Sequence, residues 1–105
     1  MADGPGFGEL IELGIRRLPR GEATELCSGL EPEGSIDGMN GPIDMYGLER
    51  GWMVVEPVPG GDRVLRFFIS RADAEGFMNR RMEQFDRLWD GCGCRIDYDS
   101  KEPTW

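Results

Sequence analysis

The segment between Ser70 and Gly91 carries the clearest pattern in the chain, because its apolar residues recur with the period of an α-helix. The stripe consists of Ala74, Phe77, Met78, Arg81, Met82, Phe85, Leu88 and Trp89. Ser70 with Asp73 three positions later is typical of a helix start, and Gly91 is typical of a helix end. We therefore predict a helix over residues 71–90 that buries Phe77, Met78, Met82, Phe85 and Trp89 against a second layer.

Two apolar stretches before this helix predict that second layer. Residues 51–58 and 63–69 are rich in β-branched and aromatic residues, and the turn sequence PGGD separates them. Residues 94–98 alternate in polarity, which predicts a further strand. The expected class is α+β: a small antiparallel or mixed sheet (β-hairpin 51–69 plus strand 94–98) with helix 71–90 packed on one face and an N-terminal helical segment.

The first half of the chain has weaker patterns. A helical segment is expected over residues 7–18, although a strand also fits there because the apolar residues alternate as well. In residues 21–30 the apolar positions Ala23, Leu26, Cys27 and Leu30 fall on one face of a helix, which predicts a short second helix. Glycine and proline are frequent in residues 31–50, so we expect one long acidic loop, pinned to the body by a few apolar side chains.

The length of 105 residues predicts a single domain, 1–105, with one hydrophobic core. Residues 1–6 are expected to be a flexible leader and residues 99–105 a polar tail. The longest apolar runs are too short to span a bilayer, and the first residues lack the basic and apolar regions of a signal peptide. We therefore expect a cytoplasmic protein that does not bind membranes.

Phe67 and Phe68 are adjacent in the second strand of the predicted hairpin, so their side chains must point to opposite faces of the sheet. One of them faces the long helix. The other is either covered by residues 7–30 or exposed as an aromatic patch that marks an interface. The sequence leaves both possibilities open.

The chain contains no histidine, which removes the commonest general base and the commonest metal ligand in proteins. Its three cysteines, Cys27, Cys92 and Cys94, are an odd number, as expected for reduced thiols in the cytoplasm. One C-x-C pair and one distant cysteine do not make a tetrahedral zinc site. We therefore expect no enzyme activity, no metal and no cofactor.

Acidic residues dominate the charge, with 20 Asp and Glu against 12 Lys and Arg and a formal net charge of −8. Residues 21–49 contain seven acids and no base. These acids are Glu22, Glu25, Glu31, Glu33, Asp37, Asp44 and Glu49. They are either a solvated surface that keeps the protein soluble or a binding site for a basic protein or nucleoprotein complex. Direct nucleic-acid binding is not expected, because phosphates would be repelled.

In size and charge alone, the chain is similar to two groups of small acidic proteins. One group contains the inhibitors of nucleic-acid machinery from phages and mobile elements, including anti-CRISPR and DNA-mimic proteins, and the other contains the immunity proteins of nuclease toxins. This likeness implies a protein-binding inhibitor with an acidic interface. The alternative is an accessory or structural subunit that binds a larger assembly through an exposed aromatic sheet face.

Overall fold

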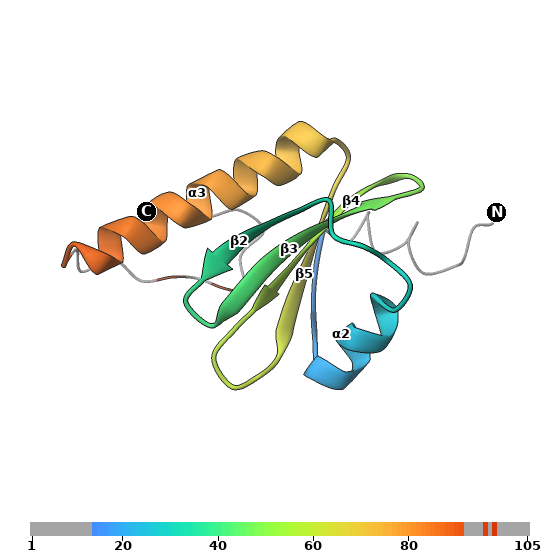
Figure 1. The fold of residues 1–105 in the computed structure, drawn as a ribbon, viewed down its shortest axis with the longest axis horizontal. Helices are drawn as coiled ribbons and strands as arrows, with labels where there is room; N and C mark the ends of the chain where they lie inside the picture. The colour runs from blue at the N-terminus through green and yellow to red at the C-terminus, as the bar shows by residue number, and fades with distance from the viewer. Residues whose placement is uncertain (1–13, 92–95, 97, 99–105) are drawn as a thin grey trace.

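The computed structural model describes residues 14–91, 96 and 98, which form one five-stranded antiparallel sheet with a helix against each face (Figure 1). The strands are β1 (Ile15–Leu18), β2 (Gly34–Gly38), β3 (Gly41–Leu48), β4 (Gly51–Pro57) and β5 (Arg63–Phe68), and the helices are α2 (Arg20–Leu26) and α3 (Arg71–Trp89). The strand order is β1-β5-β4-β3-β2. Consecutive strands β2 to β5 form a meander, and β1 pairs with the outer side of β5.

The α+β class and the long C-terminal helix are confirmed. Strands β4 and β5 form the predicted hairpin, in which Trp52 pairs with Phe68 and Pro57 with Arg63. Pro57 has no amide hydrogen, and it occupies the last position of its strand. Helix α3 begins after Ser70, whose Oγ accepts a hydrogen bond of 3.1 Å from the Asp73 N–H. This cap satisfies one of the free amides of the first helical turn.

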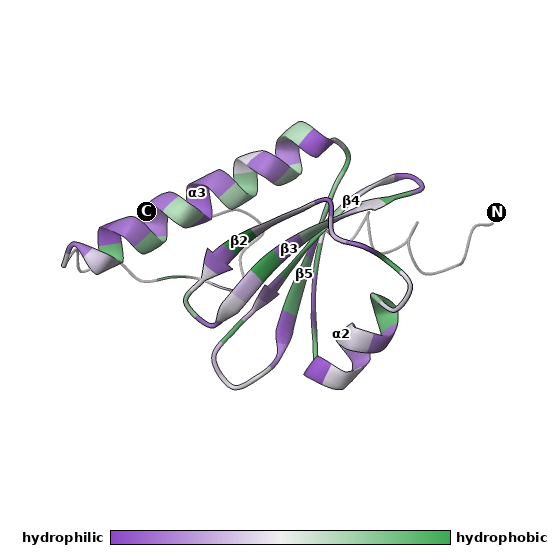
Figure 2. Ribbon diagram, in the orientation of Figure 1, coloured by the Kyte–Doolittle hydropathy of each residue, from purple (hydrophilic) through white to green (hydrophobic). Residues whose placement is uncertain are grey.

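Each face of the sheet has its own hydrophobic cluster, because successive residues of a strand point to opposite faces. One cluster joins α3 to the sheet and contains Ile43, Met45, Val54, Ala74, Phe77 and Met78. The other joins α2 to the opposite face and contains Ala23, Tyr46, Met53, Val55, Leu65 and Phe67. In Figure 2 the hydrophobic colour accordingly runs along strands that lie between the two helices.

The prediction of one long loop over residues 31–50 is wrong, because this segment contains the hairpin of β2 and β3. Its glycines stand where strands approach other groups closely. A Cβ at Gly38 would lie 2.6 Å from the Gly41 carbonyl oxygen, and a Cβ at Gly47 would lie 3.3 Å from the Trp52 side chain. The glycines therefore permit close packing within a hairpin, whereas their frequency in the sequence suggested irregular structure.

The two ends of the predicted fold need correction. Residues 15–18 form β1, so the helix expected over residues 7–18 is wrong in its described part, and its remainder lies outside the described residues. The strand alternative fits residues 15–18, because they pair with β5. The short helix expected over residues 21–30 exists as α2. Most of the expected strand 94–98 lies outside the described residues, and neither Ile96 nor Tyr98 is in a strand.

Of the two adjacent phenylalanines of β5, Phe67 is buried and Phe68 is partly buried. Phe67 is buried in the cluster beneath α2, and Phe68 packs against Phe77 of α3, with their ring centroids 5.9 Å apart. Two residues that were expected to be buried are exposed instead, since Met82 is 40% and Trp89 is 88% exposed. Helix α3 extends beyond the strands at its C-terminal end (Figure 1), where Trp89 is the last residue of the helix, whereas Met82 lies beside the edge strand β2.

Replacing Phe77 by alanine should lower the free energy of unfolding by about 3–5 kcal/mol, because its ring is buried between the sheet and α3. Met82→Ala is the matched control on the same helix, and it should cost clearly less than Phe77→Ala because Met82 is 40% exposed. Urea denaturation of both variants measures the difference. Equal losses would contradict the packing of α3.

Candidate functional site

Five of the seven acids predicted as partner-binding residues are exposed on α2, in the segment that follows it, or in the turn between β3 and β4. Glu22 and Glu25 are exposed on α2, and their spacing of three residues places them on one side of the helix. Glu31 and Glu33 are exposed in the segment that connects α2 to β2, and Glu49 is exposed in the turn between β3 and β4. We name Glu22, Glu25, Glu31 and Glu33 the α2 acidic surface.

The connecting segment also approaches the β3–β4 turn. The Glu33 N–H donates a hydrogen bond of 2.7 Å to the Met45 carbonyl oxygen, which attaches the segment to β3. The Glu33 Cγ lies 3.8 Å from the position that a Cβ would occupy at Gly47, two residues before Glu49. Glu33 therefore lies beside the end of β3 that leads to Glu49, on the face of the sheet where Trp52 packs.

Asp37 and Asp44 do not belong to the same patch. Asp37 lies in β2 next to the β2–β3 turn, whereas Glu49 follows the other end of β3. With a rise of about 3.3 Å per residue, the eight residues of β3 separate these turns by roughly 23 Å. Asp44 is half-buried, and one of its carboxylate oxygens accepts a hydrogen bond of 2.8 Å from the Ser35 hydroxyl. The seven acids therefore belong to one stretch of the sequence but do not form one surface patch.

The acids of the α2 acidic surface are unpaired within the part of the chain that the structure describes. Acids elsewhere are held by arginines: Arg17 Nε lies 3.0 Å from Asp62, and Arg71 Nε lies 3.0 Å from Glu75. No such ion pair involves Glu22, Glu25, Glu31 or Glu33 among residues 14–91, 96 and 98. Their charges are therefore available to a partner.

A pocket of about 420 Å³ lies between α2 and the sheet, and its lining includes Cys27, Asp44, Tyr46 and Arg63. Burial, and to a lesser degree the Asp44 carboxylate, raises the pKa of the Cys27 thiol. Burial and then Asp44 also raise the pKa of Tyr46 to about 12. Both groups therefore stay protonated near neutral pH. Because only the thiolate is a strong nucleophile, this pocket does not support cysteine-dependent catalysis.

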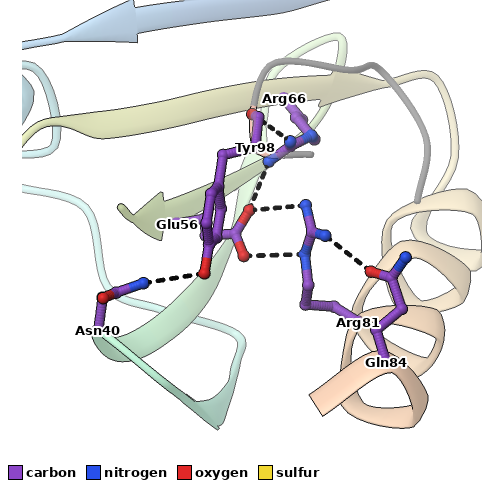
Figure 3. Close-up of polar contacts among 6 residues, drawn as sticks. All are labelled: Asn40, Glu56, Arg66, Arg81, Gln84 and Tyr98. Atoms are coloured by element: carbon purple, nitrogen blue, oxygen red, sulfur yellow. Dashed lines mark hydrogen bonds and ion pairs between the residues drawn. The ribbon is translucent and has the colours of Figure 1, made fainter. Parts of the chain in front are cut away.

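A second polar cluster, buried between the sheet and α3, was not predicted from the sequence. Glu56 of β4 is fully buried, and its Oε1 accepts hydrogen bonds from Arg66 Nη1 at 2.7 Å and Arg81 Nη2 at 3.0 Å (Figure 3). Arg81 Nε also lies 2.9 Å from Glu56 Oε2 and forms an ion pair with it. The geometry of this contact does not meet the requirements of a hydrogen bond. Two guanidinium groups from different elements thus hold one carboxylate.

The surrounding groups complete this cluster. Arg81 Nη1 donates to Gln84 Oε1 at 2.7 Å, and Arg66 Nη2 donates to the Tyr98 carbonyl oxygen at 2.6 Å. Both guanidinium groups lie over the Phe77 ring, at 4.5 Å for Arg66 and 5.1 Å for Arg81. The cluster therefore links β4, β5 and α3 to Tyr98 near the C-terminus (Figure 3). The sequence carries one sign of this cluster, because the charged residue Arg81 lies on the otherwise apolar face of the predicted helix.

Removing the carboxylate from this cluster should destabilise the protein strongly. Glu56→Gln leaves two buried guanidinium groups without their anion, and we expect it to lower the free energy of unfolding by about 3–5 kcal/mol. The control Glu75→Gln breaks an exposed pair within α3 and should cost less than about 0.5 kcal/mol. Chemical denaturation tests both, and a small effect of Glu56→Gln would contradict a structural role for the cluster.

The raised pKa of Cys27 predicts a slow reaction with iodoacetamide. Because the pKa is raised in the folded protein, the thiolate fraction at pH 8 is lower than that of an ordinary thiol, and alkylation slows with it. Asp44→Asn removes a negative charge that raises the pKa, so this variant should react faster. Mass spectrometry of the peptide containing Cys27 measures both rates. A slower reaction in Asp44→Asn would refute the assigned cause.

Comparison with known proteins assigns no family to this fold or site. No protein-family model matches the chain, and no curated protein or solved structure matches it. In the described part of the chain, neither α2 nor α3 is both long enough and apolar enough to cross a membrane. The function is therefore inferred from the residues and their arrangement.

Proposed function

We propose that this protein is a non-enzymatic binding module whose α2 acidic surface docks a basic protein or nucleoprotein complex. In this proposal it inhibits a nucleic-acid-binding partner, as anti-CRISPR, DNA-mimic and nuclease-immunity proteins do. The observation that carries the proposal is the set of four exposed carboxylates without ion-pair partners among the described residues. Unpaired carboxylates give a surface that complements a basic phosphate-binding groove.

The support beneath these acids is ordered by packing, which favours binding. Ala23 of α2 is buried in the cluster on this face of the sheet, and Leu26 and Leu30 pack against the same cluster. A charged surface that is already ordered loses less conformational entropy on association than a free loop would. The net charge of −8 also steers a basic partner toward the protein and repels nucleic acid itself.

The alternative function required an exposed aromatic face of the sheet. Its candidate contacts were Phe67 or Phe68 together with Trp105. Phe67 is buried beneath α2 and Phe68 is partly buried against α3, whereas Trp105 lies outside the described residues. An accessory subunit that binds through this face therefore has no support from these two residues. The acidic interface remains the stronger proposal.

Reversing two acids of the α2 acidic surface should weaken the complex without unfolding the protein. The variant Glu25→Lys/Glu31→Lys changes the net charge by 2 × 2, from −8 to −4. The control Glu83→Lys/Asp90→Lys makes the same change on exposed residues of α3 and its C-cap. Affinity capture from the native host identifies the partner, and surface binding assays then compare the variants. We expect at least about a tenfold loss for the first variant and much less for the control.

Salt provides a second readout of the same interface. Association driven by exposed charges slows as the Debye length falls from about 10 Å at 0.1 M to about 3 Å at 1 M ionic strength. The wild type should therefore show a steep salt dependence that Glu25→Lys/Glu31→Lys reduces. Unchanged affinity and unchanged salt dependence in this variant would mean that the acids only solvate the protein.

A further inference from the structure

Two neighbouring hollows, together called the groove below, lie between α3 and β2, the edge strand of the described sheet. One part of the groove, about 330 Å³ in volume, is lined by β2 and the first half of α3, including Met78 and Asn79. The next part, about 340 Å³, is lined by β2 together with Met82, Phe85 and Asp86. Both parts share Ser35 and Ile36, so they follow the same strand edge.

The backbone of β2 offers hydrogen-bonding groups on this open edge. Asp37 pairs with Pro42 of β3, and proline has no amide hydrogen to donate. The pair Asp37–Pro42 is therefore not joined by backbone hydrogen bonds. Pairs with and without backbone hydrogen bonds alternate in an antiparallel ladder, so the backbones of Ser35 and Asp44 are not hydrogen-bonded to each other either. The N–H and C=O groups of Ser35 and Asp37 therefore point away from β3, toward the groove.

The side chains in the groove suit an extended segment with alternating polarity. Ile36 belongs to the cluster beneath α3, and Met82 and Phe85 continue this apolar surface along the helix. A strand added beside β2 would place every second side chain against these residues. Its other side chains would lie on the opposite face, where Ser35 and Asp44 are hydrogen-bonded to each other.

The carboxylates beside the groove favour a basic occupant. Its lining contains Glu33, Asp37 and Asp86, for which residues 14–91, 96 and 98 supply no ion-pair partner. Among the described residues that line the two parts, Arg71 is the only base, and it is paired with Glu75. Side chains alternate along β2, so Asp37 lies on the same face as Ser35, where every second side chain of an added strand would lie. Its carboxylate therefore favours lysine or arginine at those positions of the incoming segment.

We propose that a basic, extended segment of the partner adds to β2 as a sixth strand and lies in this groove. The inference rests on the proposed function, because it describes how the basic partner completes its contact. Two outward-facing residues supply only a few backbone hydrogen bonds, so the strand adds to the contact made by the α2 acidic surface.

Synthetic peptides test the groove directly with the full-length protein. The probe is acetyl-KVKVKVK-amide, in which valines would face α3 and lysines the other side, and acetyl-EVEVEVE-amide is the control. We expect the lysine peptide to shift the backbone amide NMR signals of residues 34–38 and 78–86, and the glutamate peptide to leave them unchanged. If the lysine peptide shifts neither segment, the groove is not its binding site.

Methylated peptides test whether the backbone pairs. In a strand, the amides of alternate residues point to opposite edges. N-methylation of the lysine residues should block antiparallel addition, and N-methylation of the valine residues should block parallel addition. One methylated peptide should therefore bind at least about tenfold more weakly than the other. Equal binding of the two, whether strong or weak, would overturn strand addition.

Variants of Ser35 separate this inference from the proposed function. Ser35→Pro removes an outward N–H, whereas Ser35→Ala removes only the hydroxyl that contacts Asp44. The proline variant, but not the alanine variant, should weaken both the peptide and the captured partner. A partner lost by Glu25→Lys/Glu31→Lys but retained by Ser35→Pro would overturn the groove and leave the acidic surface. The reverse result would retain the groove and reject the acidic surface.

Discussion

The buried carboxylate of Glu56 is the interaction on which the α3 side of the structure depends. Arg66 of β5 and Arg81 of α3 both reach it at 2.7–3.0 Å, and the groups are completely buried. A charge in this position is tolerated only when its partners are present, because burying an ion without a counterion costs several kcal/mol. The cluster therefore sets the position of α3 over the sheet, and with it the width of the groove beside β2.

The two helices give the sheet different surfaces. Helix α2 is short, is held by Ala23 and Leu26, and presents carboxylates to solvent. Helix α3 is longer than the strands beneath it and continues beyond the edge of the sheet, where Trp89 is exposed. The α2 acidic surface and the groove between α3 and β2 are joined through Glu33, which belongs to both. A basic partner that contacts both would cover one continuous part of the molecule.

The elements that were predictable from the sequence are those whose ends and faces carry local signals. Helix α3 has a serine cap and a regular apolar period, and the β4–β5 hairpin has an explicit turn. The period of α3 identified its apolar face but not what covers it, so the exposure of Met82 and Trp89 was missed. The β2–β3 hairpin was mistaken for a loop because the glycines that permit close packing resemble loop residues.

The candidate site was predictable only in part. The base-free stretch identified exposed acids on α2 and the segment that follows, but strand pairing separates Asp37 from Glu49 and half-buries Asp44. The Glu56 cluster and the β2 edge both depend on contacts between residues far apart in the chain, which composition and periodicity do not contain. Arg81 on an apolar stripe was the one local sign of a buried charge network.

Hydrogen–deuterium exchange of the free protein and of its complex with the captured partner tests the central claim most directly. If a basic partner covers the α2 acidic surface and extends β2, amides in residues 20–38 should become protected on binding, because their solvent-exposed N–H groups are shielded or hydrogen-bonded. The solvent-facing residues of α3 should exchange at their former rate. Protection confined to α3 or β1, with residues 20–38 unchanged, would contradict the account.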